Sequence, residues 1–146
     1  MLLENKKARL NFEFLEKFEA GVDLLGFEVK SLRAKHGSLG GAYISVREGE
    51  AWLVGVFIPP YQPANTPSDF NPYRPRRLLL TREEISYLSG KGSSRGLTIV
   101  PVSIYNKKGR IKVEMAVVRG KKKHDKRETL KRREAEREIR RTLKKG

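Results

Sequence analysis

The amino-acid sequence predicts a mainly β fold, in which a small antiparallel β-barrel with short helices precedes a basic C-terminal tail. Residues 1–119 contain β-rich runs separated by glycine-rich turns in the order β-α-ββ-α-ββ, which suits such a barrel. Residues 120–146 contain 13 Lys and Arg against 5 Asp and Glu and no aromatic residue, so they have little means of burying themselves against a core. We therefore divide the chain into a barrel domain, 1–119, and a tail, 120–146.

The first strand and the first helix are predicted from the spacing of apolar residues. Apolar and charged side chains alternate between residues 12 and 22, which indicates a half-buried strand. Residues 15–16 interrupt the alternation, and such a break is typical of a β-bulge. From Leu25 on, apolar residues recur at spacings of four and three, which predicts a short amphipathic helix over residues 27–34.

Two hairpins are predicted from paired β-rich runs. Residues 42–47 and 51–58 are joined by a short turn in which Gly49 can supply a positive φ. Residues 97–105 and 110–118 form the second pair, joined by a turn of Asn, two Lys and Gly. Each pair predicts two antiparallel neighbours in the barrel.

The segment between the hairpins contains a predicted loop and a predicted helix. Residues 61–77 hold four prolines and are expected to form a loop, and a loop of this length is either functional or partly disordered. Thr81 and Glu84 form a capping box, in which each side chain accepts a hydrogen bond from the other residue's backbone amide. Gly90 is placed to end this helix.

Composition narrows the class of function. The chain carries a formal net charge of +15, which predicts a polyanionic partner, with nucleic acid as the first candidate. No apolar run approaches the ~20 residues of a membrane span, so we expect no membrane partner. The chain has no cysteine, and its N-terminus lacks the shape of a signal peptide, which together predict a cytoplasmic protein.

The sequence offers little for catalysis. Its only histidines are His36 and His124, and His36 is expected at the surface or at a helix end. The chain contains no P-loop and no nucleophile elbow. We therefore expect no enzyme activity, no metal and no cofactor.

Charged residues on the predicted helix 27–34 permit two interpretations. Glu28, Lys30 and Arg33 lie off its apolar face, and such a pattern often marks a solvated surface. Alternatively, Lys30 and Arg33 contact phosphates, while Glu28 accepts from a base edge or orients a neighbouring cation.

Aromatic residues fall into two groups. Those inside strand runs are expected to pack in the core, whereas those in the proline-rich loop are better placed to stack on bases. The first group is Tyr43, Trp52, Phe57 and Tyr105, and the second is Tyr61, Phe70 and Tyr73.

Four blocks occur in the order of one known family. The most specific are Glu-Val-Lys-Ser-Leu-Arg within residues 26–33 and Gly-Lys-Lys-Lys-His-Asp-Lys-Arg at residues 120–127. Residues 5–8 and 74–80 supply the other two. The chain resembles the SsrA-binding proteins (small protein B), the bacterial partners of transfer-messenger RNA (tmRNA) in trans-translation.

This resemblance implies an oligonucleotide-binding-like β-barrel that binds the tRNA-like domain of tmRNA and delivers it to stalled ribosomes. In the family, a glutamate and a lysine that match Glu28 and Lys112 contribute to RNA binding. With the residues of the neighbouring blocks, the expected RNA-binding set is Asn5, Lys7, Glu28, Lys30, Arg33 and Lys112.

The resemblance also implies a role for the tail. In the family, the tail enters the empty messenger channel of the small ribosomal subunit and folds there as a helix, in place of the missing codon–anticodon pair. The ring at His124 would stack on a ribosomal RNA base. The residues expected at the decoding site are Lys121, Lys122, His124, Asp125, Lys126 and Arg127.

We therefore expect a monomeric RNA-binding protein whose partners are tmRNA and the small ribosomal subunit. Two alternatives remain open on the sequence. One is a structural ribosomal protein with an extension that threads ribosomal RNA. The other is a nuclease on the same barrel, although few carboxylates lie near the basic patches to hold a metal.

Overall fold

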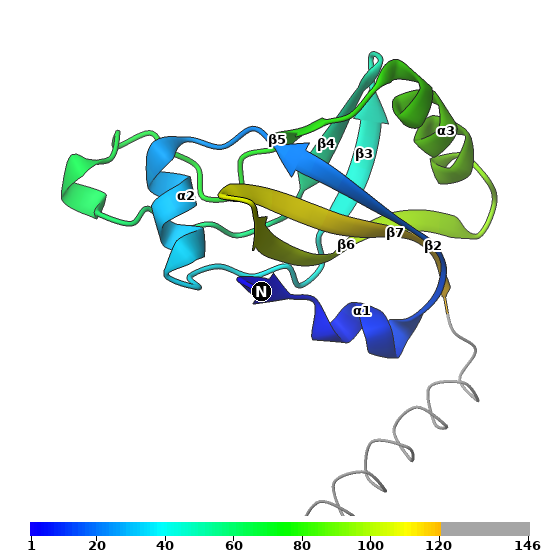
Figure 1. Ribbon diagram of the computed structural model, residues 1–146, viewed down its shortest axis with the longest axis horizontal. Helices are drawn as coiled ribbons and strands as arrows, with labels where there is room; N and C mark the ends of the chain where they lie inside the picture. The colour runs from blue at the N-terminus through cyan, green and yellow to red at the C-terminus, as the bar shows by residue number, and fades with distance from the viewer. Residues whose placement is uncertain (121–146) are drawn as a thin grey trace, which may run out of the picture.

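The computed structural model describes residues 1–120, which form one antiparallel sheet with short helices around it (Figure 1). The strands are β1 (Leu3–Glu4), β2 (Phe12–Val22), β3 (Tyr43–Arg47), β4 (Glu50–Val54), β5 (Arg76–Leu79), β6 (Leu97–Lys107) and β7 (Arg110–Gly120). The helices are α1 (Lys6–Asn11), α2 (Gly26–Arg33) and α3 (Arg82–Gly92), with a 3-10 turn, η1, at Pro63–Asn65.

The seven strands are ordered β1-β6-β7-β2-β5-β4-β3. Strand β3, at one end of this order, contacts β6 near the other end, so the sheet curves back on itself around the core. The predicted fold class, a mainly β barrel-like domain with short helices, is confirmed. No helix within residues 1–120 is long and apolar enough to span a membrane.

Strand β2 shows why the alternating pattern is interrupted. Its pairing with β7 shifts between Phe14 and Glu16, so Leu15 is the extra residue of a β-bulge and its side chain is exposed. Before the bulge, Phe14 packs outside the main core, in a small cluster under α1. After it, Phe18 packs against the main core. The bulge therefore lets one strand contribute to two apolar clusters on opposite faces of the sheet.

Both predicted hairpins form, with tighter turns than the sequence suggests. Glu48 and Gly49 have φ values of 52° and 75°, and Lys108 and Gly109 have 50° and 79°. Each pair is therefore a two-residue turn with positive φ at both positions, the geometry that matches strand twist. Strand β4 ends at Val54 rather than at residue 58, because the chain turns at Gly55, where φ is 82°.

Two strands, one α-helix and the 3-10 turn η1 were not predicted, and the predicted end of α3 was wrong. Strands β1 and β5 and helix α1 are short, and β5 begins at Arg76, inside the predicted loop 61–77, so the loop ends two residues earlier than expected. The two arginines of β5 hide its alternation: Arg76 and Leu78 are buried, whereas Arg77 and Leu79 are exposed. Helix α3 begins at the predicted capping box but runs through Gly90 to Gly92.

Gly37 is a position where a side chain should destabilise the fold. Its φ is 146°, and a Cβ there would lie 2.7 Å from the carbonyl oxygen of Phe57. We expect Gly37→Ala to lower the free energy of unfolding by about 2–4 kcal/mol, since it combines backbone strain with overpacking. Gly26→Ala is the matched control, because nothing lies within 4 Å of its Cβ position at the start of α2. Equal urea-unfolding midpoints for the two variants would contradict this prediction.

Candidate nucleic-acid interface

A basic groove lies where α2, β2, β5 and β7 meet. Its volume is about 500 Å³. Gly21 of β2 pairs with Lys112 of β7 and with Leu79 of β5, and its missing side chain leaves open space between these neighbours. A Cβ at Gly21 would lie 3.3 Å from Leu79 Cδ1. The glycine therefore helps to make the depression that the flanking cations line.

Four cationic side chains from three elements line this groove: Arg33, Arg77, Arg110 and Lys112. Asp23 is the single acidic residue of the lining. Cations concentrated in a concave surface attract polyanions at long range. The groove is therefore chemically suited to an RNA phosphate backbone.

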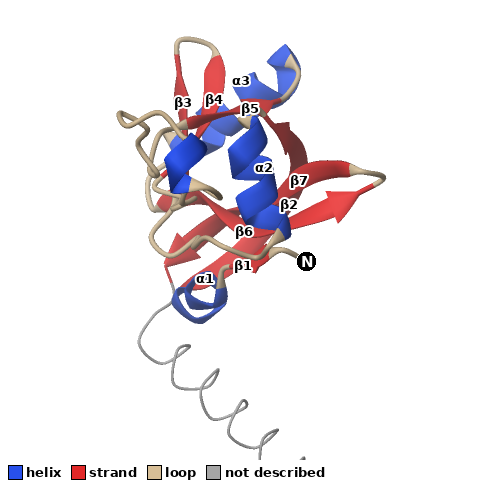
Figure 2. Ribbon diagram, turned by 90° about the vertical axis from the view of Figure 1, so that its left-hand side faces the viewer, coloured by secondary structure: helices blue, strands red, loops and turns tan. Residues whose placement is uncertain are grey.

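The groove is braced by contacts between its walls. Arg33 Nη2 at the end of α2 donates to the carbonyl oxygen of Gly109, 3.3 Å away, in the β6–β7 turn. On the far side, the amide of Asp23 donates to the carbonyl oxygen of Arg77 at 2.9 Å. Figures 1 and 2 both show α2 at the end of β2 and β7. The groove cations are thus carried on elements that contact one another directly.

Next to the groove, Glu19 organises the outer face of β6 and β7. Its carboxylate accepts hydrogen bonds from the Tyr105 hydroxyl and from Lys107 Nζ, the latter at 3.2 Å. These contacts lower the pKa of Glu19, with a smaller contribution from Lys112. Burial and the Glu19 carboxylate in turn raise the pKa of Tyr105. Glu19 therefore stays ionised and holds Lys107 near the hairpin end.

Glu28 is fully buried between two arginines. Arg76 Nε donates to Glu28 Oε2 at 2.7 Å, and Arg74 donates to both carboxylate oxygens. The amide of Leu25 also donates to Oε1, at 2.9 Å. The solvated-face interpretation of Glu28 is therefore wrong, and so is a direct contact with a base edge. Orientation of neighbouring cations, the remaining interpretation, matches these contacts.

The arginines at Glu28 fix the proline-rich loop as well. Arg76 donates to the carbonyl oxygens of Val56 at 2.8 Å and Pro72 at 3.0 Å. Just before the loop, Ser31 Oγ of α2 donates to the carbonyl oxygen of Pro59 at 2.5 Å. Helix α2 therefore holds both ends of the segment between β4 and β5.

The pKa of Glu28 reflects competing effects. Burial alone would raise it, but hydrogen bonds from Arg74, from the Leu25 amide and from Arg76 together lower it below its ordinary value. Burial also lowers the pKa of Arg76, and this effect exceeds the rise that the Glu28 carboxylate causes. An arginine starts so far above neutrality that the pair remains ionised at physiological pH.

The other predicted RNA-binding residues are scattered. Asn5 is buried: its Nδ2 donates to the Pro101 carbonyl oxygen at 2.8 Å, and its Oδ1 accepts from the Ala8 amide at 3.2 Å. Both functional groups are thus used to cap α1 and join it to β6, which leaves no direct RNA contact to its side chain. Lys7 is exposed on α1, outside the groove.

The structure therefore brings together only Arg33 and Lys112 of the predicted set. Lys30 is exposed on α2 but does not line the groove. Arg77 and Arg110 were missed, although the alternation in β5 and the position of Arg110 directly after a turn glycine were available signals. The predicted decoding-site residues, Lys121 to Arg127, lie outside the described residues.

Among the aromatics, the core prediction is wrong. Tyr43 is 42% exposed, and the other three aromatics of that group are only half-buried. Of the loop residues, Tyr61 and Tyr73 are exposed, as expected, whereas Phe70 packs edge-to-face on Phe27 with ring centroids 4.7 Å apart. His36 is exposed just after α2, as predicted.

Comparison with known proteins shows what the chain is similar to. Residues 2–145 match the family model described as SmpB protein. The chain belongs to the SmpB family. Among relatives, the SsrA-binding protein of Synechococcus elongatus is 48% identical over 146 residues, covering 100% of this chain and 95% of its own length. The SsrA-binding protein of Oleidesulfovibrio alaskensis is 48% identical over 143 residues, covering 98% of this chain and 92% of its own. The resemblance read from the sequence is confirmed.

A solved SmpB-family structure also matches. It is described as "tmRNA-SmpB: a journey to the center of the bacterial ribosome", and it aligns with a TM-score of 0.69 at 40% identity. The match covers 88% of this chain and 93% of the other. Family membership does not favour the ribosomal-protein alternative. Within residues 1–120, no three His, Cys, Asp or Glu side chains are grouped so that they could hold a metal ion.

Proposed function

We propose that this protein binds tmRNA through the basic groove and delivers it to stalled ribosomes for trans-translation. The observation that carries the proposal is the convergence of four cations from α2, β5 and β7 on one groove, in a chain of the SmpB family. The relatives are named SsrA-binding proteins, and the matching structure is of SmpB with tmRNA and the bacterial ribosome. We propose the tRNA-like domain of tmRNA as the ligand, because the resemblance to the SmpB family implies that the barrel binds this domain.

The proposed recognition is by shape and phosphate contacts. The groove offers guanidinium and ammonium groups on braced elements, and such groups position an RNA backbone without reading its sequence. Glu28 acts indirectly, because it holds Arg74 and Arg76 and with them the segment beside α2. The SmpB family is an RNA-binding family, and we propose that the protein performs no catalysis of its own.

The tail would engage the ribosome. We propose that Lys121, Lys122, His124 and the Asp125-Lys126-Arg127 triplet occupy the vacant decoding site of the small subunit. The tail's net charge of +8 favours a path lined by ribosomal RNA. We further propose that the protein is a monomer and that it acts in the cytoplasm, where ribosomes translate.

The groove can be tested by removing two of its cations. We expect the double variant Arg33→Ala/Lys112→Ala to weaken binding of tmRNA at least tenfold at physiological salt, because two phosphate contacts are lost. The slope of log affinity against log salt should become shallower by about two. Gel-shift titrations at several salt concentrations measure both quantities.

The control is Arg95→Ala, an exposed arginine in the connection between α3 and β6. It removes a positive charge without altering the groove and should leave the affinity within about twofold. An unrelated transcript of equal length should bind the unchanged protein more weakly than tmRNA. If the groove variant and the control bound tmRNA equally well, the groove would not be the RNA site.

A further inference from the structure

The basic groove adjoins the outer face of β4 and β3 through Arg77. Arg77, which lines the groove, is the direct antiparallel partner of Trp52 on β4, so the two side chains share one face of the sheet. Trp52 in turn pairs with Ser45 of β3. Trp52 therefore lies one strand spacing from Arg77. An RNA strand whose backbone lies in the groove would pass close to the indole.

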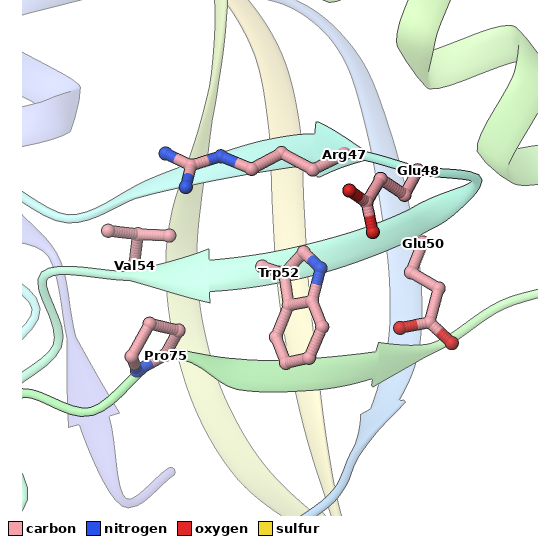
Figure 3. A pocket seen from close by; sticks show the side chains of 6 residues that line it. All are labelled: Arg47, Glu48, Glu50, Trp52, Val54 and Pro75. Atoms are coloured by element: carbon pink, nitrogen blue, oxygen red, sulfur yellow. The ribbon is translucent and has the colours of Figure 1, made fainter.

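Trp52 lies at the centre of a depression with a volume of about 610 Å³. Figure 3 shows the indole with Val54 and Pro75 on one side and the carboxylates of Glu48 and Glu50 on the other. The Arg47 side chain runs back along β3, so that its guanidinium lies away from these carboxylates. The site thus has an apolar centre between a negative and a positive end.

Its chemistry differs from that of the groove. Two carboxylates at one end repel a phosphate backbone, so this face does not suit a continuous polyanion. A half-buried indole suits the face of a single unpaired base. Carboxylates beside it accept hydrogen bonds from the edge of that base, and the guanidinium at the other end, which also donates from Nε to Ser45 Oγ at 3.2 Å, can face a phosphate.

We propose that one unpaired guanine of the bound RNA stacks on Trp52. Guanine carries two neighbouring donors, N1–H and the N2 amino group, on its Watson–Crick edge, and a carboxylate of Glu48 or Glu50 accepts both. The phosphate of that nucleotide faces Arg47. This inference rests on the proposed function, because the same RNA occupies the groove, and it adds base selectivity to a surface otherwise fitted to phosphates.

The proposal commits to RNA rather than to a protein surface. Arg77 joins the Trp52 site to a groove lined by cations, and the chain as a whole carries +15. Glu50 already accepts from Arg77 Nη1 at 3.3 Å, between two exposed side chains. A pair so exposed is weak, so Glu50 can turn to a base without a large cost.

Trp52 is the only tryptophan in the chain, so its fluorescence reports on this site directly. The probes are three single-stranded hexamers: five uridines with one guanosine, five uridines with one inosine, and six uridines. Inosine lacks the N2 amino group. The guanosine hexamer should quench the fluorescence and bind at least threefold more tightly than the inosine hexamer, and both should bind more tightly than the uridine hexamer. Equal affinity for the guanosine and inosine hexamers would overturn the guanine assignment.

Variants separate stacking from folding. Trp52→Leu keeps an apolar side chain but removes the ring, and should weaken binding of full-length tmRNA, measured by fluorescence anisotropy of labelled RNA, about tenfold. Trp52→Phe keeps a ring and should bind within about threefold of the unchanged protein. Glu48→Gln/Glu50→Gln should abolish the preference for guanosine over inosine.

The two proposals fail in distinguishable ways. If tmRNA binds, the groove variant weakens it, and Trp52→Leu binds as tightly as the unchanged protein, the stacking site is overturned while the proposed function stands. If tmRNA binds no better than an unrelated transcript, the proposed function fails, and this inference fails with it.

Discussion

Glu28→Gln is expected to lower the free energy of unfolding by about 3–5 kcal/mol, because it leaves the buried guanidinium of Arg76 without its counter-charge. Glutamine has the size of glutamate and keeps one hydrogen-bond acceptor. The lost stability therefore measures the effect of the missing charge rather than that of a cavity. Urea unfolding of the full chain, followed by circular dichroism, measures it. Gel shifts should also show weaker RNA binding, since the segment between β4 and β5 loses its attachment to α2.

The matched control is Glu13→Gln on β2. Its carboxylate accepts from Arg119 at 2.7 Å, close to the distances at Glu28, but both side chains are about half exposed. Solvent-exposed pairs contribute about 0–1 kcal/mol, so the control should lie within that range. If the two variants lowered the free energy of unfolding equally, burial would not increase the contribution of Glu28 to stability.

The pH dependence follows from the same cluster. The folded-state pKa of Glu28 is lowered, so the unfolded chain takes up its proton first as the pH falls. Its stabilising contribution is therefore complete above the unfolded pKa of about 4.3 and is lost as the pH falls through the folded value. Consequently the stability difference between the unchanged protein and Glu28→Gln should narrow below about pH 4.

Replacing Asp125, Lys126 and Arg127 together with alanine is expected to abolish tagging of stalled chains while leaving tmRNA affinity within about twofold. These residues belong to the tail rather than to the groove, so the two steps of the proposed function should separate. Tagging is measured in a reconstituted translation system by mass spectrometry of the released chains, and affinity by gel shift.

The triple substitution changes the net charge by one unit, and Lys144→Ala changes it by the same amount near the end of the tail. This control should retain both tagging and affinity. Equal loss of binding and tagging in the triple variant would refute the separation of roles, because it would assign the triplet to the RNA contact.

Sequence reasoning succeeded where structure is decided locally. The bulge in β2, the capping box of α3 and the positive φ at Gly49 each depend on residues a few positions apart. Sequence reasoning also found Arg33, because an exposed cation on a short amphipathic helix is recognisable, while Lys112 was found only through the family resemblance. These features need no knowledge of which distant segments meet.

It failed where a distant partner decides the outcome. Glu28 looks like a surface residue until Arg74 and Arg76, more than forty positions along the chain, come to lie on both sides of it. The same arginines disguised β5, since a buried arginine breaks the apolar pattern that marks a strand. Asn5 stands in a family block, yet its side chain serves the fold. Motif membership alone does not separate contact from support.

The two attachments of the proline-rich segment to α2 have a consequence for variation among relatives. Because Ser31 holds Pro59 and Glu28 holds Arg74 and Arg76, the residues between these points start and finish at positions set by the helix. Insertions within a loop whose two ends are fixed add little to the entropy cost of closing it, roughly 0.6 kcal/mol for each doubling of length. The barrel can therefore keep its geometry while the loop between β4 and β5 lengthens, shortens or changes composition from one bacterium to another.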